Sequence, residues 1–147
     1  MVNQQNIQIQ TLSENKDIRL SDSLSVIPLL VPHRDEYSET VGYLISGPRK
    51  KLLFIPDIDK WEKWNQDINT LIKQVDFALI DATFFDAAEI NNRPINEIPH
   101  PFVVESMDRF KSTPLKDKQK IHFIHFNHTN PLINNKSIAT EKVIKAG

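Results

Sequence analysis

The sequence predicts an α/β fold in which a mixed β-sheet is covered by helices. Short apolar runs bounded by turn residues recur along the chain, as is typical of buried strands, and amphipathic segments with helical spacing separate the later runs. Several runs are apolar at nearly every position, so we expect other layers on both faces of the sheet. The 147 residues are enough for one domain with its own core.

The first part of the chain is predicted to be antiparallel. Residues 6–10 alternate apolar and polar side chains and predict a short edge strand. Residues 24–31 form a nearly continuous apolar run, which predicts a buried strand. Residues 40–46 and 51–55 predict two further strands, which a four-residue turn at 47–50 joins into a hairpin.

A single amphipathic helix is predicted at residues 60–75. Its apolar side chains recur at helical spacing and fall on one face: Trp61, Trp64, Ile68, Leu71, Ile72 and Val75. Asp59 stands at the N-cap position, and Glu62 follows three residues later, as in a capping box. We therefore assign Asp59 to the helix and not to a metal.

The remaining segments alternate between strand and helix. The predicted elements are a buried strand at 77–80, a loop rich in asparagine and proline at 85–101, a helix at 102–110, a strand at 121–126 and a helix at 138–145. This alternation after an antiparallel opening is typical of a layered α/β domain.

The composition excludes several classes of protein. The formal net charge is −1, which argues against nucleic-acid and anionic-membrane partners. There is no cysteine, so any metal must be held by His, Asp or Glu. Neither a targeting segment nor an apolar run long enough to span a bilayer is visible, so we expect a cytoplasmic protein.

Ionisable side chains follow four of the predicted strands. They are His33, Asp57, Asp81 and His125, with His128 three residues further along. Ligand sites in layered α/β folds lie at the carboxyl ends of strands, so we expect these side chains to converge. Two histidines and two aspartates at one edge would make an N/O metal site.

Each of these residues also has a purely structural interpretation. His33 can pair with Asp35 or Glu36 within a loop, and Asp57 can be a turn residue. Asp81 can accept backbone N–H groups in the turn that follows it. Strand ends collect polar residues for solvation, so both interpretations stay open at this point.

The segment His122-x-x-His125-x-x-His128 is not interpreted as a three-histidine metal face. Its apolar neighbours favour a strand, in which residues three apart point to opposite sides of the sheet. His122 is therefore expected to be structural or exposed. His100, which stands between two prolines, either lines a site or closes a loop.

Four blocks of the sequence resemble metallo-β-lactamase-fold proteins related to pyrroloquinoline quinone biosynthesis protein B. The blocks are VPHRDEYSETVGY at 31–43, LFIPDIDKW at 53–61, DATFF at 81–85 and HFNHTNP at 125–131. Their order and spacing also match, over nearly the whole chain. The fold implied by this resemblance is half of an αββα sandwich.

The resemblance also implies a role for individual residues. The metal ligands would be His33, Asp57, His125 and, as an additional candidate, His128. Asp57 would be the catalytic residue that bridges the metal ions. The residues expected to orient those ligands are Asp81, Thr83 and His100. The implied cofactor is a divalent metal, with zinc as the first choice and iron or manganese as alternatives.

The sequence departs from this family in one respect. The HxHxDH signature is absent from these 147 residues. Residues 1–147 are therefore expected to be the carboxyl-terminal portion of a metallo-β-lactamase-like domain. The implied function is hydrolysis, in which metal-activated water attacks an ester, amide or phosphodiester. Without the signature, we expect weak metal binding and little hydrolysis by this chain alone.

Two hypotheses follow. As an enzyme half, the chain would join a separate amino-terminal half, or a second copy of itself, and act on a small-molecule substrate. As a non-catalytic fragment or binding module, it would keep only the half-fold. Half a sandwich leaves one sheet face uncovered, which favours association. A third alternative is an unrelated α/β domain.

Overall fold

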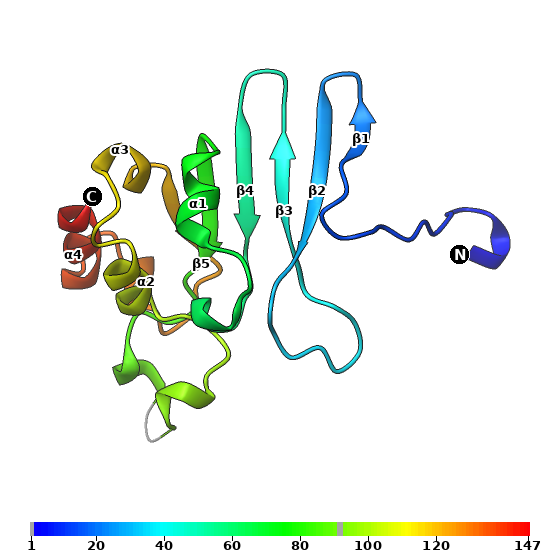
Figure 1. The fold of residues 1–147 in the computed structure, drawn as a ribbon. Coiled ribbons are helices and arrows are strands. Elements are labelled where there is room, and N and C mark those ends of the chain that lie inside the picture. The colour runs from blue at the N-terminus through cyan, green and yellow to red at the C-terminus, as the bar shows by residue number, and fades with distance from the viewer. Residues whose placement is uncertain (1, 91–92) are drawn as a thin grey trace.

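The computed structural model describes residues 2–90 and 93–147, and within these residues its centre is a six-stranded mixed sheet (Figure 1). The strands lie in sequence order and are β1 (Ile18–Ser21), β2 (Leu24–Leu30), β3 (Val41–Ser46), β4 (Lys51–Ile55), β5 (Phe77–Asp81) and β6 (Ile121–Ile124). Neighbours are antiparallel from β1 to β4, whereas β4-β5 and β5-β6 are parallel. The predicted mixed α/β sheet is confirmed, as is the hairpin between β3 and β4.

The described residues also form short helices. The α-helices are α1 (Ile68–Lys73), α2 (Val103–Arg109), α3 (Leu115–Lys118) and α4 (Ile138–Ala146), and 3₁₀ turns lie at Val2–Gln4, Trp61–Lys63, Ala87–Ile90, Ile95–Glu97 and Pro131–Ile133. The helices predicted at 102–110 and 138–145 are confirmed as α2 and α4. Strand β1 and helix α3 have no counterpart in the sequence prediction. Among the described residues, no helix has the length and apolarity needed to cross a membrane.

One face of the sheet carries the main core. Leu53, Ile55 and Ile80 are fully buried on this face, and Ile68 and Ile72 of α1 belong to the same apolar cluster. These five side chains explain why the amphipathic segment before β5 folds back onto the sheet.

The opposite face carries apolar side chains that are only partly buried. Cross-strand pairing places them in rows, and we call this surface the open face: Val26, Tyr43, Ile45, Leu52, Phe54, Phe77 and Leu79. Phe77 is 45% exposed, and the others are of intermediate burial. The expectation of covering layers on both faces is therefore met on one face only, since the open face is poorly covered by the described residues.

The helix predicted at residues 60–75 is two shorter elements. The 3₁₀ turn at Trp61–Lys63 ends at Trp64, which has extended backbone angles of φ −84° and ψ 134°. The Trp64 indole Nε1 donates to Leu30 O at 2.7 Å, which ties this residue to the end of β2. α1 begins only after Asp67. A hydrogen bond to a distant strand therefore overrides the local helical pattern.

The predicted N-cap role of Asp59 is wrong. Lys60 occupies the N-cap position of the 3₁₀ turn, and its side chain makes no cap hydrogen bond. The Asp59 carboxylate instead accepts from Lys60 N at 2.6 Å and from Lys63 Nζ at 2.7 Å. Asp67 caps α1.

The edge strand predicted at residues 6–10 does not form. Ile7 and Ile9 are 50% and 75% exposed, so their alternation buries no apolar face. The edge position is taken by β1, whose Ile18 pairs with Val26 of β2.

Two other predictions are adjusted at their ends. The strand predicted at 121–126 shortens to β6, because His125 adopts a left-handed φ of 65°. The segment predicted as a loop at 85–101 is largely irregular, with two 3₁₀ turns. Its Asn91 and Asn92 lie outside the described residues.

Replacing Asp67 with alanine is expected to lower the free energy of unfolding by about 1 kcal/mol, because the carboxylate caps α1. It accepts from Thr70 Oγ1 at 2.8 Å, Asn69 N at 3.1 Å and Thr70 N at 3.2 Å. The bond from the Thr70 hydroxyl, opposed by desolvation, lowers the pKa of Asp67. The carboxylate's contribution is therefore present above its ordinary pKa of about 3.9 and lost as pH falls through the folded pKa.

Urea denaturation at pH 7 and at pH values below 4 measures this effect. Asp67→Asn is the matched control, because asparagine caps about as well but does not titrate. The advantage of the wild type over Asp67→Asn should shrink in acid. An Asp67→Ala protein as stable as the wild type at pH 7 would contradict the capping role.

Candidate metal centre

The sheet delivers ionisable side chains to one of its edges. β2 and β4 are both antiparallel to β3, and β5 and β6 are parallel to β4, so these four strands run in one direction. Their carboxyl ends lie at the same edge, where α/β sheets bind ligands. His33 follows β2, Asp57 follows β4, Asp81 ends β5 and His125 follows β6.

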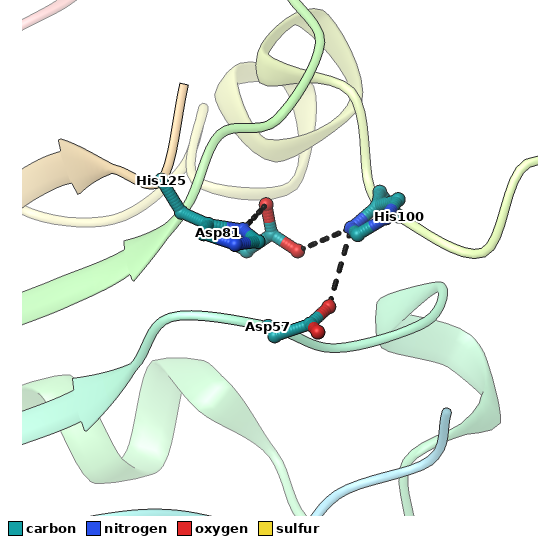
Figure 2. A group of neighbouring side chains, drawn as sticks. All are labelled: Asp57, Asp81, His100 and His125. Carbon is teal, nitrogen blue, oxygen red and sulfur yellow. Dashed lines mark hydrogen bonds and ion pairs between the residues drawn. The ribbon is translucent and has the colours of Figure 1, made fainter. Parts of the chain in front are cut away.

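Four side chains converge at this edge (Figure 2). Asp57, Asp81, His100 and His125 each offer one ligand atom, and these atoms all lie within 4.8 Å of one another. His100 comes from the segment between β5 and α2, and its Nδ1 is 2.8 Å from Asp81 Oδ2 and 3.4 Å from Asp57 Oδ1. Two carboxylates and two imidazoles form the N/O donor set that zinc, iron and manganese accept.

His33 lies beside this group. Its Nε2 is 2.9 Å from Asp57 Oδ1, and its ring meets the His100 ring edge-on at a centroid distance of 5.4 Å. Both atoms of the close pair are buried, and neither makes a hydrogen bond of acceptable geometry to any described residue. Buried polar atoms normally have partners, and a cation shared by the two side chains would satisfy both. The residues present therefore fit a divalent ion.

Asp81 is held from several sides and is fully buried. Its Oδ1 accepts from Thr83 N at 2.8 Å and from Thr83 Oγ1 at 2.7 Å, and its Oδ2 accepts from Ile58 N at 3.2 Å. Burial alone would raise the pKa of Asp81, but the interactions with His100 and His125 outweigh it and the pKa lies below its ordinary value. The carboxylate is thus ionised near neutral pH.

His125 stands at the point where β6 ends. Its Nδ1 is 3.0 Å from Thr83 Oγ1 and 3.8 Å from Asp81 Oδ1. The interaction with Asp81, opposed by partial burial, raises the pKa of His125. Thr83 Oγ1 also lies 3.2 Å from His100 Nδ1, so one hydroxyl lies against both imidazoles.

The structure brings together most of the site residues that the sequence predicts. His33, Asp57 and His125 meet at one edge, and Thr83 lies among them. His128 does not join this group: its ring is exposed and its Nδ1 is 3.1 Å from Asn127 Oδ1. Its assignment as a metal ligand remains a prediction.

Two residues to which the family resemblance gives only a supporting role lie inside the cluster itself. Asp81 and His100 each offer an atom to the group of potential ligands. The position of Asp81 directly after an apolar strand is a signal that the sequence contains. His100 has a weaker signal, namely a histidine held between Pro99 and Pro101 in the loop that follows β5.

The structural interpretations of His33 and His122 have different outcomes. Asp35 does not pair with His33 but accepts from Thr40 N and Thr40 Oγ1, both at 3.1 Å. His122 is exposed on the sheet, with its ring tilted against Phe77 at a centroid distance of 6.0 Å, as expected for a residue outside the site.

Residues 1–127 match the family described as beta-lactamase superfamily domain. The chain belongs to this superfamily. It is also similar to coenzyme PQQ synthesis protein B of Nitrosococcus oceani, with 29% identity over 133 residues, which cover 84% of this chain and 42% of that protein. The predicted relationship to pyrroloquinoline quinone biosynthesis protein B is thereby confirmed.

Solved structures show the same fold. Zn²⁺-bound PqqB from Methylobacterium extorquens matches with a TM-score of 0.71 at 23% identity, over 94% of this chain and 48% of that chain. Igni18, a metallo hydrolase from Ignicoccus hospitalis, matches with 0.59 at 13% identity, over 99% and 57%. YhfI from Bacillus subtilis, a metallo-beta-lactamase fold protein, matches with 0.61 at 11% identity, over 99% and 55%. The chain spans about half the length of these relatives.

Proposed function

We propose that this chain carries metal-binding residues of a metal-dependent hydrolase of the metallo-β-lactamase type. The observation that carries the proposal is the buried pair of His33 Nε2 and Asp57 Oδ1, which lie 2.9 Å apart without a hydrogen bond. Donor atoms of three further residues, Asp81, His100 and His125, gather beside this pair. The superfamily membership and the metallo-hydrolase and Zn²⁺-bound relatives support the same conclusion.

The chain's own residues have distinct parts in this proposal. Asp57 faces both His33 and His100, so we assign it to holding the ion. Asp81, which is ionised and fully buried, contacts the His100 and His125 rings and fixes their orientation. When bound, a divalent ion supplies a Lewis acid and lowers the pKa of a bound water to about 7, which suits hydrolysis of an ester, amide or phosphodiester.

Zinc is the first candidate for the ion, with iron or manganese as alternatives. The cluster offers only nitrogen and oxygen donors, and the imidazoles of His33, His100 and His125 are ligands that zinc favours. Iron and manganese accept the same donors, so the carboxylates of Asp57 and Asp81 do not separate the three metals.

A second candidate function is a non-catalytic binding module that keeps the half-fold. The poorly covered open face favours it, because an apolar surface of this kind is typical of a surface that binds a partner. Metal binding without turnover is the behaviour that separates this candidate from the hydrolase.

The deciding experiment is elemental analysis of the purified chain beside a His33→Ala, Asp57→Ala double variant. We expect zinc in the wild type and a loss of at least about tenfold in metal content in the double variant. His122→Ala is the matched control, because His122 is exposed and outside the cluster. Metal that is absent from the wild type, or that survives in the double variant, would overturn the site.

Activity is measured on the metal-loaded chain with chromogenic ester, amide and phosphodiester substrates. Turnover that disappears in the double variant supports the hydrolase. Stoichiometric metal with no turnover of any class supports the binding module.

A further inference from the structure

We propose that Asn130 is a positioning residue. It holds the His125 imidazole next to Asp81 and so fixes the distance between these two side chains in the metal centre. The inference rests on the proposed function, because it treats His125 as a ligand. Asn130 is only 2% exposed, although it lies in the irregular segment after β6.

The Asn130 side chain fastens this segment to the end of β5. Its Nδ2 donates to Ala82 O at 2.6 Å and to Thr83 O at 3.3 Å. Its Oδ1 accepts from Leu132 N at 2.9 Å, where it caps the 3₁₀ turn at Pro131–Ile133. Every polar group of the buried amide therefore has a partner, as a fixed buried amide requires.

Backbone hydrogen bonds complete the same connection. Asn130 N donates to Asn127 O at 2.9 Å, and Asn127 N donates to Thr83 O at 2.9 Å. Thr83 is also the residue whose hydroxyl lies 3.0 Å from His125 Nδ1 and donates to Asp81 Oδ1 at 2.7 Å. The Asn130 amide thus binds the short stretch directly after β5, Ala82 and Thr83, whose Thr83 hydroxyl contacts both partners of the His125–Asp81 pair.

The backbone of His125 shows why such a fastening is needed. Its φ is 65°, in the left-handed region that is sterically unfavourable for a residue with a Cβ. Such a conformation persists only where the surroundings impose it. Ala82 N donates to Ile124 O just before His125, and the bonds through Asn127 and Asn130 hold the chain just after it. His125 therefore turns between two fixed points.

A simpler interpretation is that Asn130 only caps the 3₁₀ turn. That role uses the Oδ1 acceptor alone, whereas positioning uses the Nδ2 donors to Ala82 O and Thr83 O. Asn130→Asp separates the two roles, because aspartate caps as well as asparagine but presents an acceptor to both carbonyl oxygens. Asn130→Ser also keeps a good cap, without adding a charge.

The test measures the His125 conformation in the metal-free chain and zinc affinity in the same variants. Nuclear magnetic resonance gives φ of His125 from its backbone shifts and its HN–Hα coupling, and competition with a chromophoric chelator gives the zinc Kd. In Asn130→Asp we expect His125 to leave the left-handed region and the zinc Kd to rise by about 10–100-fold. Ser137→Ala is the matched control, because it removes a cap at α4 that does not contact the metal centre.

Each outcome decides the question. An unchanged His125 φ together with a zinc Kd within about twofold of the wild type, in both Asn130 variants, would overturn the proposal. If circular dichroism shows that Asn130→Asp does not fold, Asn130→Ser supplies both measurements. If the wild type binds no zinc, the proposed function fails, and the His125 φ in the metal-free variants alone confirms or overturns the role of Asn130.

Discussion

Replacing Asp81 with alanine is expected to abolish metal binding and to lower the free energy of unfolding by about 3 kcal/mol or more. The change removes a fully buried acceptor and leaves the N–H groups of Ile58 and Thr83 without their partner. It also frees the His100 ring, whose Nδ1 lies 2.8 Å from Asp81 Oδ2. Urea denaturation at pH 7 and zinc competition measure the two effects.

Asp81→Asn separates these effects. The asparagine keeps the shape and one carbonyl oxygen, so the fold should lose less stability than in Asp81→Ala, while the lost negative charge should still weaken zinc binding. If the free energy of unfolding of Asp81→Ala lay within about 1 kcal/mol of the wild-type value, this carboxylate would not be what holds the end of β5.

Replacing His100 with alanine is expected to raise the zinc Kd by more than about 100-fold, because the loss of a ligand should exceed the 10–100-fold effect of losing a supporting residue. His100 lies between Asp57 and Asp81, within 3.4 Å and 2.8 Å of their nearest oxygens. The side chain is largely but not fully buried, at 16% exposure, so the change in stability should be smaller than for Asp81→Ala. Competition titration of the folded variant is the measurement.

Two other histidines are compared in the same experiment. His122→Ala should leave the zinc Kd within about twofold, because its exposed ring packs against Phe77 and is not one of the clustered donors. His128→Ala tests the predicted ligand role of His128: a zinc Kd within about twofold of the wild type would remove it from the ligand set, since its exposed ring lies against Asn127. A His128→Ala variant as weak as His100→Ala would instead establish His128 as a ligand.

The positions of most strands could be predicted from the sequence, because the signal is local. The runs that became β2, β3, β4 and β5 are apolar over short stretches and end at turn residues. The break at Trp64 could not be predicted, because it depends on a hydrogen bond to Leu30, which lies 34 residues away. The strand expected at 6–10 does not form although its local pattern is right, because its apolar side chains have no apolar surface to pack against in the described residues.

The candidate site likewise contains residues that the sequence could reveal and residues that it could not. Asp57 and Asp81 could be found because each comes directly after an apolar strand, and parallel strands bring such positions together. His100 could not be placed, because the path of the loop after β5 is set by contacts such as Val103 N to Phe84 O rather than by a periodic pattern. The left-handed turn at His125 was likewise invisible, since no glycine or asparagine marks it.

The predicted partners, a second copy or a separate amino-terminal half, remain predictions. We expect the open face to be the surface at which either would bind, because its side chains, such as Phe54 and Leu79, are apolar and only partly covered.

Binding at that surface would also make the stability of the folded chain depend on the concentration of whatever binds there. Anything that binds the folded chain and not the unfolded one adds RT ln(1 + [L]/Kd), or about 2.7 kcal/mol at 100 times Kd. If the open faces of two copies bind each other, the chain is its own stabilising ligand, and its melting temperature rises with its concentration. A Tm for this protein must then be given with the protein concentration at which it was measured. Thermal melts over a dilution series would measure how strongly the open faces of two copies bind each other.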